Sequence, residues 1–213
     1  MTTTFTLPNL QPTQFTDLLK VEDHYLSEVE ISQQQVDQLE IYHAIIEQAR
    51  LTQLDLHNCD LAKFDLNQVE IKNCDFSNCH FEEATFYQVH FVNCKLIGAT
   101  FDQAYLGDVT FENCQLSLTN WHQVTAKQTA FTDCDLSDAD LSEAKLTKTT
   151  FSGSRLEQAS FLGTSLKKLD LSESIFKNLG VQMGDLYGVK LDQEQAARFA
   201  QIFLNVKISD PTD

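Results

Sequence analysis

The sequence contains few of the residues that normally build turns. Its 213 residues include 7 Gly and 3 Pro, and two of the prolines, Pro8 and Pro12, lie within the first dozen positions. A globular fold with many loops uses more of both residues, because they supply the backbone angles of tight turns. The shortage is unusual for an enzyme and favours a chain that changes direction by a regular device with few special turn residues.

Basic residues are scarce as well. The chain has 15 Lys and Arg residues against 31 Asp and Glu residues, which gives a formal net charge of −16. An acidic surface repels phosphate groups, so this balance argues against direct binding of nucleic acid. The hydrophobic residues, 42% of the chain, are nevertheless sufficient for a buried core.

Long apolar runs are absent. No segment approaches the ~18 consecutive apolar residues of a membrane-spanning helix. The first ten residues, MTTTFTLPNL, lack the basic flank and the apolar run of a signal peptide. We therefore expect a cytoplasmic protein without a membrane partner, whose six cysteines are free thiols rather than disulfides.

The sequence does contain a five-residue period. Every fifth residue from Val21 to Leu191 is apolar, and among these 35 positions only Ala126 is small and none is polar. A second series, two residues earlier, holds small or apolar side chains. All six cysteines fall in this second series: Cys59, Cys74, Cys79, Cys94, Cys114 and Cys134.

This period matches neither a helix nor a simple strand, whose apolar residues recur at 3.6 and 2 residues. A five-residue frame requires a backbone that turns a corner every five residues. Four corners close a square coil, so one coil takes about 20 residues and neighbouring coils stack like on like. Identical residues do recur 20 apart, and we expect them to form two core ladders: Cys74, Cys94, Cys114 and Cys134, and Phe91, Phe111, Phe131 and Phe151.

These residues carry a family resemblance. The segments CDFSNCHFEEATF, CDLSDADLSEAKL and ASFLGTSLKKLDLSESIF follow the A/C-D/N-L/F-x-x pattern of pentapeptide-repeat proteins, over roughly residues 21–191. The resemblance implies an all-β solenoid, a right-handed quadrilateral β-helix. Within the family the chain resembles the Qnr-type quinolone-resistance group, through a lead-in that contains Leu-Pro, an uninterrupted repeat and the last fifty residues, from FLGTSLKKLDL to FLNVKI.

We divide the chain into an N-terminal extended cap (residues 1–20), the repeat (21–191) and a C-terminal helix and tail (192–213). Asp192 followed by Gln195 is typical of a helix N-cap with a capping box. The resemblance implies a homodimer through this helix, because Qnr-like proteins dimerise here; the alternative is a purely intramolecular cap. The apolar residues at helical spacing are the expected contacts: Ala196, Phe199, Ala200, Ile202, Phe203 and Leu204.

Residues 32–50 fit two local structures. Ser32 and Gln35 form a possible capping box ahead of helically spaced apolar residues. Leu39 and Ile41 nevertheless match the two inward-facing positions of the five-residue repeat, and so do the equivalent pairs that follow them. We favour a coil of the solenoid over a helix.

A 20-residue coil assigns each residue to one of four faces. The face centred on residues 21, 41, 61 and onward carries nine acidic residues and one base, Lys63, for a net charge of −8. The next face is neutral. Its five lysines and its tyrosines, among them Tyr87, Tyr105 and Tyr187, are more typical of ordinary surface than of a contact site, and the other two faces each come to −3. We call the nine acids the acidic stripe: Glu22, Asp23, Glu40, Asp60, Glu82, Glu83, Asp102, Asp140 and Glu143.

The stripe suggests mimicry of DNA. Coils that rise ~4.8 Å each make a rod on the order of 40 Å long, and duplex DNA carries roughly 23 charges over that length. Qnr-like relatives are understood to occupy the DNA-handling surface of DNA gyrase and topoisomerase IV, so the resemblance implies the same partners and protection from quinolones. The alternatives are a scaffold with another partner, or acidity that serves solubility alone. The frame also leaves no insertion for the loops that project from plasmid-type Qnr proteins.

Catalytic and metal-binding patterns are not apparent. The cysteines are 5 or 20 residues apart at inward positions, with no Cys-x-x-Cys pair, and His57, His80, His90 and His122 fall at outward positions on different faces. The sequence has no phosphate-binding glycine loop and no nucleophile motif. A filled solenoid also offers no cleft for a small-molecule substrate. We expect no enzyme activity, no metal and no cofactor.

Overall fold

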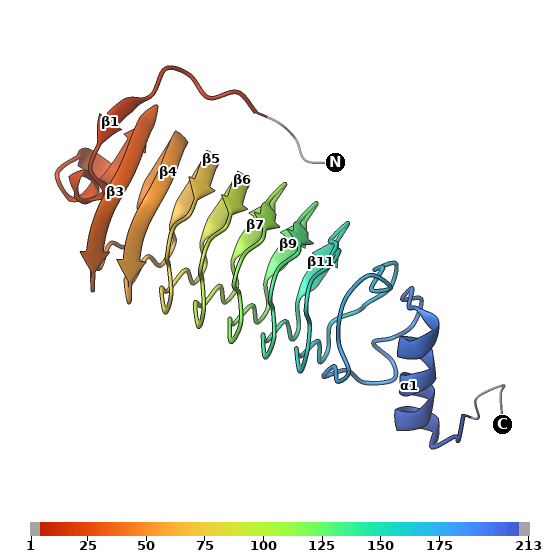
Figure 1. Ribbon diagram of the computed structural model, residues 1–213. Coiled ribbons are helices and arrows are strands. Elements are labelled where there is room, and N and C mark those ends of the chain that lie inside the picture. Colours follow the sequence, from red (N-terminus) through yellow and green to blue (C-terminus); the bar gives the residue numbers. More distant parts are fainter. Residues whose placement is uncertain (1–4, 209–213) are drawn as a thin grey trace.

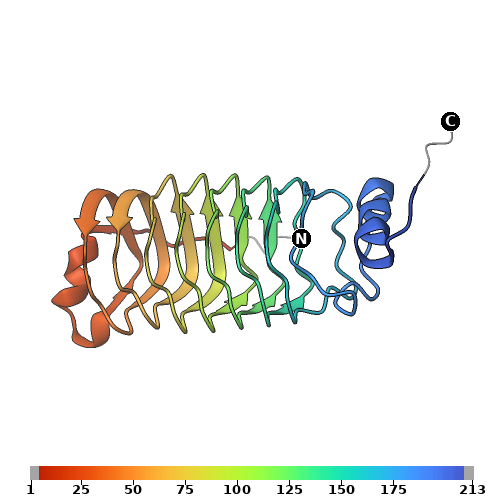
Figure 2. The same cartoon turned by 90° about the horizontal axis from the view of Figure 1, so that it is seen from below.

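The protein is a straight rod of stacked square coils that ends in one α-helix (Figure 1). The computed structural model describes residues 5–208. Successive coils pair in parallel with a constant offset of 20 residues, as in Leu66 with Phe86 and Leu106 with Ala126. Seen from below, the coils drawn in orange to teal lie in register, and the blue coils before the helix are less regular (Figure 2). The predicted fold class, a right-handed quadrilateral β-helix with a C-terminal helical cap, is confirmed.

The strands form one sheet that winds around the rod. Regular strands are longest in the first coils and shorten to three residues toward the C-terminus, where isolated bridges continue the same ladder. The 3-10 helices are η1 (Phe15–Leu19) and η2 (Glu22–His24), and the α-helix is α1 (Gln193–Leu204). The strands are β1 (Gln11–Thr13), β2 (Tyr25–Ser27), β3 (Val29–Asp37), β4 (Ile45–His57), β5 (Asp65–Lys72), β6 (Thr85–Val92), β7 (Tyr105–Gly107), β8 (Thr110–Glu112), β9 (Thr125–Lys127), β10 (Ala130–Thr132) and β11 (Lys145–Thr147).

Left-handed backbone conformations make the corners. Every fifth residue from Glu28 to Lys168 has a positive φ, a region that costs most side chains energy. The corners therefore do require special backbone angles, contrary to the expectation from the low glycine content, but Asn, Asp, Gln, Glu and Lys adopt most of them. Glycine occupies three of the corners, and a Cβ on Gly153, which has φ +66°, would meet the Asp133 carboxylate of the preceding coil unless that side chain moved.

The core of the rod contains stacked aromatic rings. Phe91, Phe111, Phe131 and Phe151 form a column in which successive ring centroids are 4.7, 4.9 and 5.1 Å apart. Neighbouring ring planes in this column lie within 9° of parallel. Such contacts stabilise a fold by about 0.5–1.5 kcal/mol each beyond burial. The column therefore ties consecutive coils together.

The one small side chain among the inward-facing fifth residues lies in the same coil as the largest one. Trp121 stacks on Phe101 at 3.9 Å, and its Nε1 donates a hydrogen bond to Thr119 Oγ1 at 2.7 Å. Trp121 occupies the inward position one corner before Ala126. The largest and the smallest inward side chains thus share one coil, and both are buried.

A 3-10 helix closes the N-terminal end. β1 pairs with β3, and η1 then buries the side chains of Phe15 and Leu18. The Phe15 ring meets the Phe64 ring edge to face at 6.3 Å. The prediction of an extended cap over residues 1–20 is incomplete, because Phe15 and Leu18 lie outside the five-residue frame and follow no period that would reveal them.

The first coil begins after this cap. Val21, the first position of the predicted frame, is exposed beside η2, so the buried column starts at Leu26. Residues 32–50 contribute to β3 and β4, so the coil interpretation of this segment is correct. Residues 5–10 run from β1 back along the rod, and the Phe5 ring lies 4.9 Å from the His90 ring of β6 (Figure 1).

At the other end, α1 closes the last coil. Gln195 N donates to Asp192 Oδ1 at 2.8 Å, and Asp192 N donates to Gln195 Oε1 at 3.0 Å, which completes the predicted capping box. Gln195 Nε2 also donates to the carbonyl oxygens of Leu171 and Ser174, both at 2.9 Å. Within the described residues, α1 is too short to cross a membrane, and no other helix is long enough to do so.

Candidate interaction surfaces

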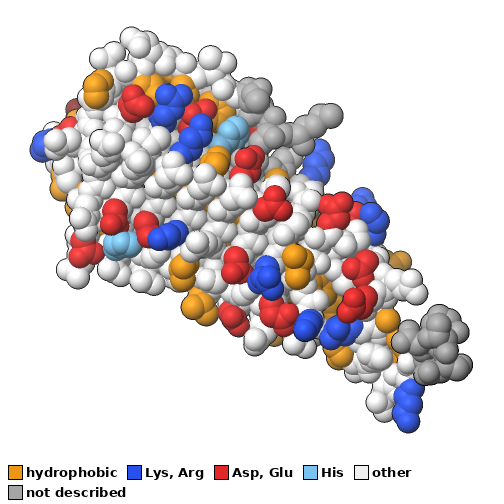
Figure 3. All heavy atoms as spheres, viewed as in Figure 1, with side chains coloured by type: hydrophobic (Ala, Val, Ile, Leu, Met, Phe, Trp, Pro, Cys, Tyr) orange, Lys and Arg blue, Asp and Glu red, His pale blue; other side chains and the backbone are white. Residues whose placement is uncertain are grey.

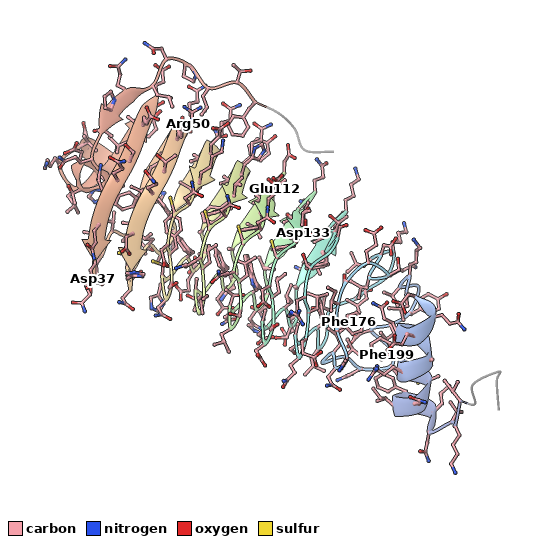
Figure 4. The ribbon with its side chains drawn as sticks, in the orientation of Figure 1. Asp37, Arg50, Glu112, Asp133, Phe176 and Phe199 are labelled. Atoms are coloured by element: carbon pink, nitrogen blue, oxygen red, sulfur yellow. The ribbon has the colours of Figure 1, made fainter. Side chains whose placement is uncertain are left out.

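The acidic stripe forms columns on one face of the rod. All nine of its residues lie at the surface, and none is buried. The columns arise because residues 20 apart pair in the ladder, as Glu40 does with Asp60. Figures 3 and 4 view the rod from the opposite side, two corners away from the stripe, and Figure 4 labels Arg50, Glu112 and Asp133 on that side.

The structure divides the stripe into two groups. Seven acids lie between Glu22 and Asp102, while Asp140 and Glu143 lie nearer the C-terminus. Within the first group, Glu22 and Asp23 belong to η2 rather than to a coil. The coil between the two groups presents only uncharged side chains and a histidine on this face: Asn120, His122 and Gln123.

Few bases neutralise the middle of the stripe. Lys63 Nζ lies 3.4 Å from Glu83 Oε2. Burial raises the pKa of Glu82, but hydrogen bonds from Thr100 and His80 outweigh it, so the pKa of this carboxyl lies below its usual value. Asp102 has one carboxylate oxygen that is shielded from solvent and has no hydrogen-bond partner in the described part of the chain. Among the nine carboxylates of the stripe, Glu83 alone lies within ion-pairing distance of a lysine or arginine of the described residues.

Two acids near the N-terminal end of the opposite face, Glu30 and Glu70, are paired instead (Figure 3). Arg50 lies between Glu30 and Glu70, at 3.9 and 3.0 Å, and Lys72 lies 3.3 Å from Glu70. Burial raises the pKa of Glu70, but the hydrogen bond from Arg50 and the charge of Lys72 hold it below its usual value. Phe5 covers the next position of this column, His90. This face is therefore less available to a partner than the stripe.

One charged cluster was not identified from the sequence. His57 lies between two stacked aspartates, 2.6 Å from Asp55 and 3.6 Å from Asp75, and Lys95 lies 3.7 Å from Asp75. The available signal was the 20-residue spacing of the aspartates, with His57 two residues after Asp55. The cluster offsets the repulsion between aspartates that occupy equivalent positions in neighbouring coils.

The neutral face separates its charges along the rod. Four of its five acids precede residue 109, whereas all its lysines follow residue 126. No acidic group of the described residues lies within ion-pairing distance of these lysines. The net charge of zero conceals this separation, which the face-by-face sum could not reveal. We call the five residues the lysine cluster: Lys127, Lys145, Lys148, Lys167 and Lys168.

The residues predicted for dimerisation fall into two groups. Phe199 is only 7% exposed and packs on Phe176 at 6.0 Å, so it belongs to the cap (Figure 4). Ile202 and Leu204 are each 57% exposed, and Ala196 is exposed as well. An apolar hollow of about 590 Å³ opens beside the helix and includes part of both groups: Met183, Gly184, Leu186, Tyr187, Phe199, Ala200, Phe203 and Leu204.

The six cysteines are all buried and free. Contacts between stacked sulfurs shift the thiol pKa values in both directions: contact with the Cys114 sulfur raises the pKa of Cys94, and contact with the Cys134 sulfur lowers that of Cys114. Because all six thiols are buried in the packed interior, they are shielded from reagents whichever way the pKa shifts. Among residues 5–208, no group of three or more His, Cys, Asp or Glu side chains is placed to hold a metal ion.

Comparison with known proteins agrees with this geometry. Residues 64–133 and 84–161 match the family model described as a pentapeptide repeat region. Full-length QnrB1, described as a plasmid-mediated fluoroquinolone resistance protein, shares 22% identity with a TM-score of 0.43, over 83% of this chain and 100% of that chain. No curated protein matches the chain.

Two cyanobacterial structures are also similar. HetL of Nostoc, a pentapeptide repeat protein involved in heterocyst differentiation regulation, shares 19% identity with a TM-score of 0.36, over 79% of this chain and 85% of that chain. Rfr23 of Cyanothece shares 13% identity with a TM-score of 0.37, over 84% of this chain and 97% of that chain. Residues 64–161 match the repeat model, so this part of the chain is a pentapeptide repeat, and the same ladder continues on both sides of it.

Proposed function

We propose that this protein is an acidic, rod-shaped DNA mimic that binds DNA gyrase or topoisomerase IV and inhibits the enzyme or protects it from quinolones. The main observation that supports the proposal is the acidic stripe. Its carboxylates lie in columns on one face of a rigid rod, with Lys63 as the only lysine or arginine of that face between residues 21 and 191. A surface of this kind fits a basic groove built for duplex DNA.

The charge spacing supports mimicry. Glu40, Asp60, Glu82, Glu83 and Asp102 place five carboxylates on four consecutive coils. Four coils rise about 14 Å, and a single strand of B-DNA carries roughly four phosphates over that distance. Since the backbone ladder fixes the columns, little entropy is lost when a partner binds them.

The partner is chosen from the resemblance of the repeat and of the last fifty residues to Qnr-type proteins. Fluoroquinolone resistance, which the description of QnrB1 names, comes to this chain only as part of the proposal. A homodimer through α1 belongs to the same proposal. It would place two stripes end to end and roughly double the length of the acidic surface.

The test is a pair of charge-reversal variants. Glu82→Lys, Glu83→Lys and Asp102→Lys together should abolish the effect of the protein on gyrase supercoiling, measured with and without a fluoroquinolone. The matched control is Glu112→Lys, Asp133→Lys and Asp138→Lys, which makes the same change of charge on other faces and should retain most of the effect. Melting curves establish that both variants are folded.

Two results would count against the proposal. If the stripe variant and the control act equally on gyrase, the stripe is not the contact surface. If neither the unmodified protein nor the variants affect supercoiling, and gyrase subunits are not recovered with the protein from lysate, the protein is a scaffold for another partner.

A further inference from the structure

The backbone ladder is interrupted near the C-terminal third of the rod. Within the described chain, no backbone hydrogen bond links residues 145–153 to residues 165–173, although these segments occupy equivalent positions in neighbouring coils. On the other two faces the same coils remain joined, through Leu141 N to Ser160 O at 2.7 Å and Leu156 N to Ile175 O at 2.9 Å. The interruption is therefore local, and it leaves one edge of β11 unpaired (Figure 1).

The free edge presents backbone donors. In the preceding coil, Gln128 N donates to Thr147 O at 2.9 Å, but Lys148, the equivalent of Gln128, makes no such bond to the next coil. Lys145 N donates backward to Val124 O at 2.8 Å, so alternate N–H groups of this strand point toward the gap. An edge with unpaired N–H and C=O groups is a template for another strand.

Stacked lysines explain why the coils separate here. Lys148 and Lys168 occupy the same corner in successive coils, and both have positive φ. Earlier in this column, Gln48, Gln68 and Gln88 hydrogen-bond to one another at 3.3 and 3.1 Å. Two lysines cannot make such a bond, and like charges at directly paired positions destabilise a sheet.

A surface hollow of about 530 Å³ lies between the separated coils, and this volume is within the usual range of ligand sites. Leu146 and Thr147 line one side of it, Leu169 lies on the other, and three members of the lysine cluster surround it: Lys148, Lys167 and Lys168. Thr149, in the same segment, is only 3% exposed, and its hydroxyl has no partner among the described residues. The site thus combines an unpaired strand edge, apolar walls and unpaired positive charge.

We propose that this hollow is a docking site for an extended acidic segment of a partner protein, which adds as a strand to the free edge of β11. The unpaired backbone groups would form the ladder bonds, and Lys148, Lys167 and Lys168 would attract carboxylates along the added strand. Strand addition of this kind uses main-chain bonds for affinity and side chains for selectivity. Nucleic acid is disfavoured as the occupant because only a peptide backbone can supply ladder bonds to the free edge of β11. This proposal does not depend on the acidic stripe.

The test measures binding of a fluorescent peptide of about eight residues that alternates Glu and Val. We expect binding that weakens with salt and falls by about tenfold or more in the variant Lys148→Gln, Lys167→Gln and Lys168→Gln. The matched control, Lys20→Gln, Lys72→Gln and Lys95→Gln, removes the same charge elsewhere and should bind within about threefold of the unmodified protein. A second peptide, with proline at alternate positions, cannot form ladder bonds and should bind at least about tenfold more weakly.

The cluster variant should remain folded. The changes Lys148→Gln and Lys168→Gln would continue the glutamine column of the earlier coils, so a melting temperature at or above that of the unmodified protein shows that lost binding is not lost structure. If the proline peptide binds as tightly as the Glu-Val peptide, or if inorganic phosphate at equal concentration displaces the Glu-Val peptide, the hollow is only a site for small anions. Either of these results, or no measurable binding of the Glu-Val peptide, overturns the proposal.

Discussion

Corner residues carry the strain of this fold. At the corner positions a left-handed backbone recurs every five residues, and polar side chains tolerate it better than bulky apolar ones. Leu118 is the exception: it has φ 61° and is 63% exposed. Its side chain gains little burial in return for the unfavourable backbone conformation.

Leu118→Asn should therefore stabilise the protein. Asparagine adopts the left-handed region more readily, so we expect a gain of about 0.5–1 kcal/mol in the free energy of unfolding. The melting temperature should rise by about 2 °C. Leu162→Asn is the control, since Leu162 is also exposed but has no positive φ. An equal gain in both variants would assign the effect to solubility rather than to the corner.

The cysteines should resist modification in the folded protein. All six are buried in the packed interior of the rod, so each thiol is shielded from reagents in solution. Mass spectrometry after treatment with iodoacetamide should detect almost no alkylation under native conditions and six adducts after unfolding in urea. Rapid native alkylation of any one cysteine would show that its coil opens locally.

Elements at the two ends of the rod close it by different means. At the N-terminus η1 inserts Phe15 and Leu18 into the open coil. At the C-terminus α1 lies across the last coil, and the amide of Gln195 hydrogen-bonds carbonyl oxygens that have no further coil to pair with. The polar contact is as important as the apolar one, because unpaired strand edges would otherwise be exposed.

Gln195→Ala should consequently destabilise the C-terminal cap. The change leaves the carbonyl oxygens of Leu171 and Ser174 without their donor in a buried site, at a cost of about 1–3 kcal/mol. Urea unfolding followed by circular dichroism measures the loss. Gln193→Ala, at an exposed position of the same helix, should change stability by less than about 0.5 kcal/mol. Similar losses in both variants would mean that Gln195 acts only through helix propensity.

The predictability of each element depends on whether it follows the frame. Inward residues such as Phe111 and Cys114 repeat every 20 positions, so their place in the core follows from spacing alone. Phe15 and Phe64 do not: the first lies outside the frame, and the second is a large residue in the series of small ones. Their contact depends on how the cap folds back, which no periodicity encodes.

At the scale of the whole molecule, charge is ordered by both face and position along the rod. Counting charges by face was enough to predict the acidic stripe as a surface feature. It did not reveal the interruption beside β11, because a net charge hides the stacking of Lys148 on Lys168. That feature depends on which coils pair, and therefore on the three-dimensional ladder.

Assembly is the remaining property at this scale. If the protein dimerises through α1, Ile202→Glu together with Leu204→Glu should yield monomers, because both side chains are exposed and apolar. Light scattering coupled to size-exclusion chromatography gives the mass. Phe199 is unsuitable for this test, since it is buried in the cap. The control, Gln193→Glu with Gln201→Glu, adds the same charge to the helix and should remain dimeric; a dimer in both variants would place the interface elsewhere.

The constant offset of 20 residues has a consequence for how the rod tolerates insertions and deletions. Removing one full coil would shorten the rod and leave every later residue on its own face. Removing one five-residue repeat would instead turn everything that follows by a quarter of a revolution. Asp140 and Glu143 would then leave the direction of Glu82 and point along a neighbouring side. Insertions or deletions of whole coils therefore keep every later surface residue on its own face, whereas those of single five-residue repeats move the later residues to a neighbouring face.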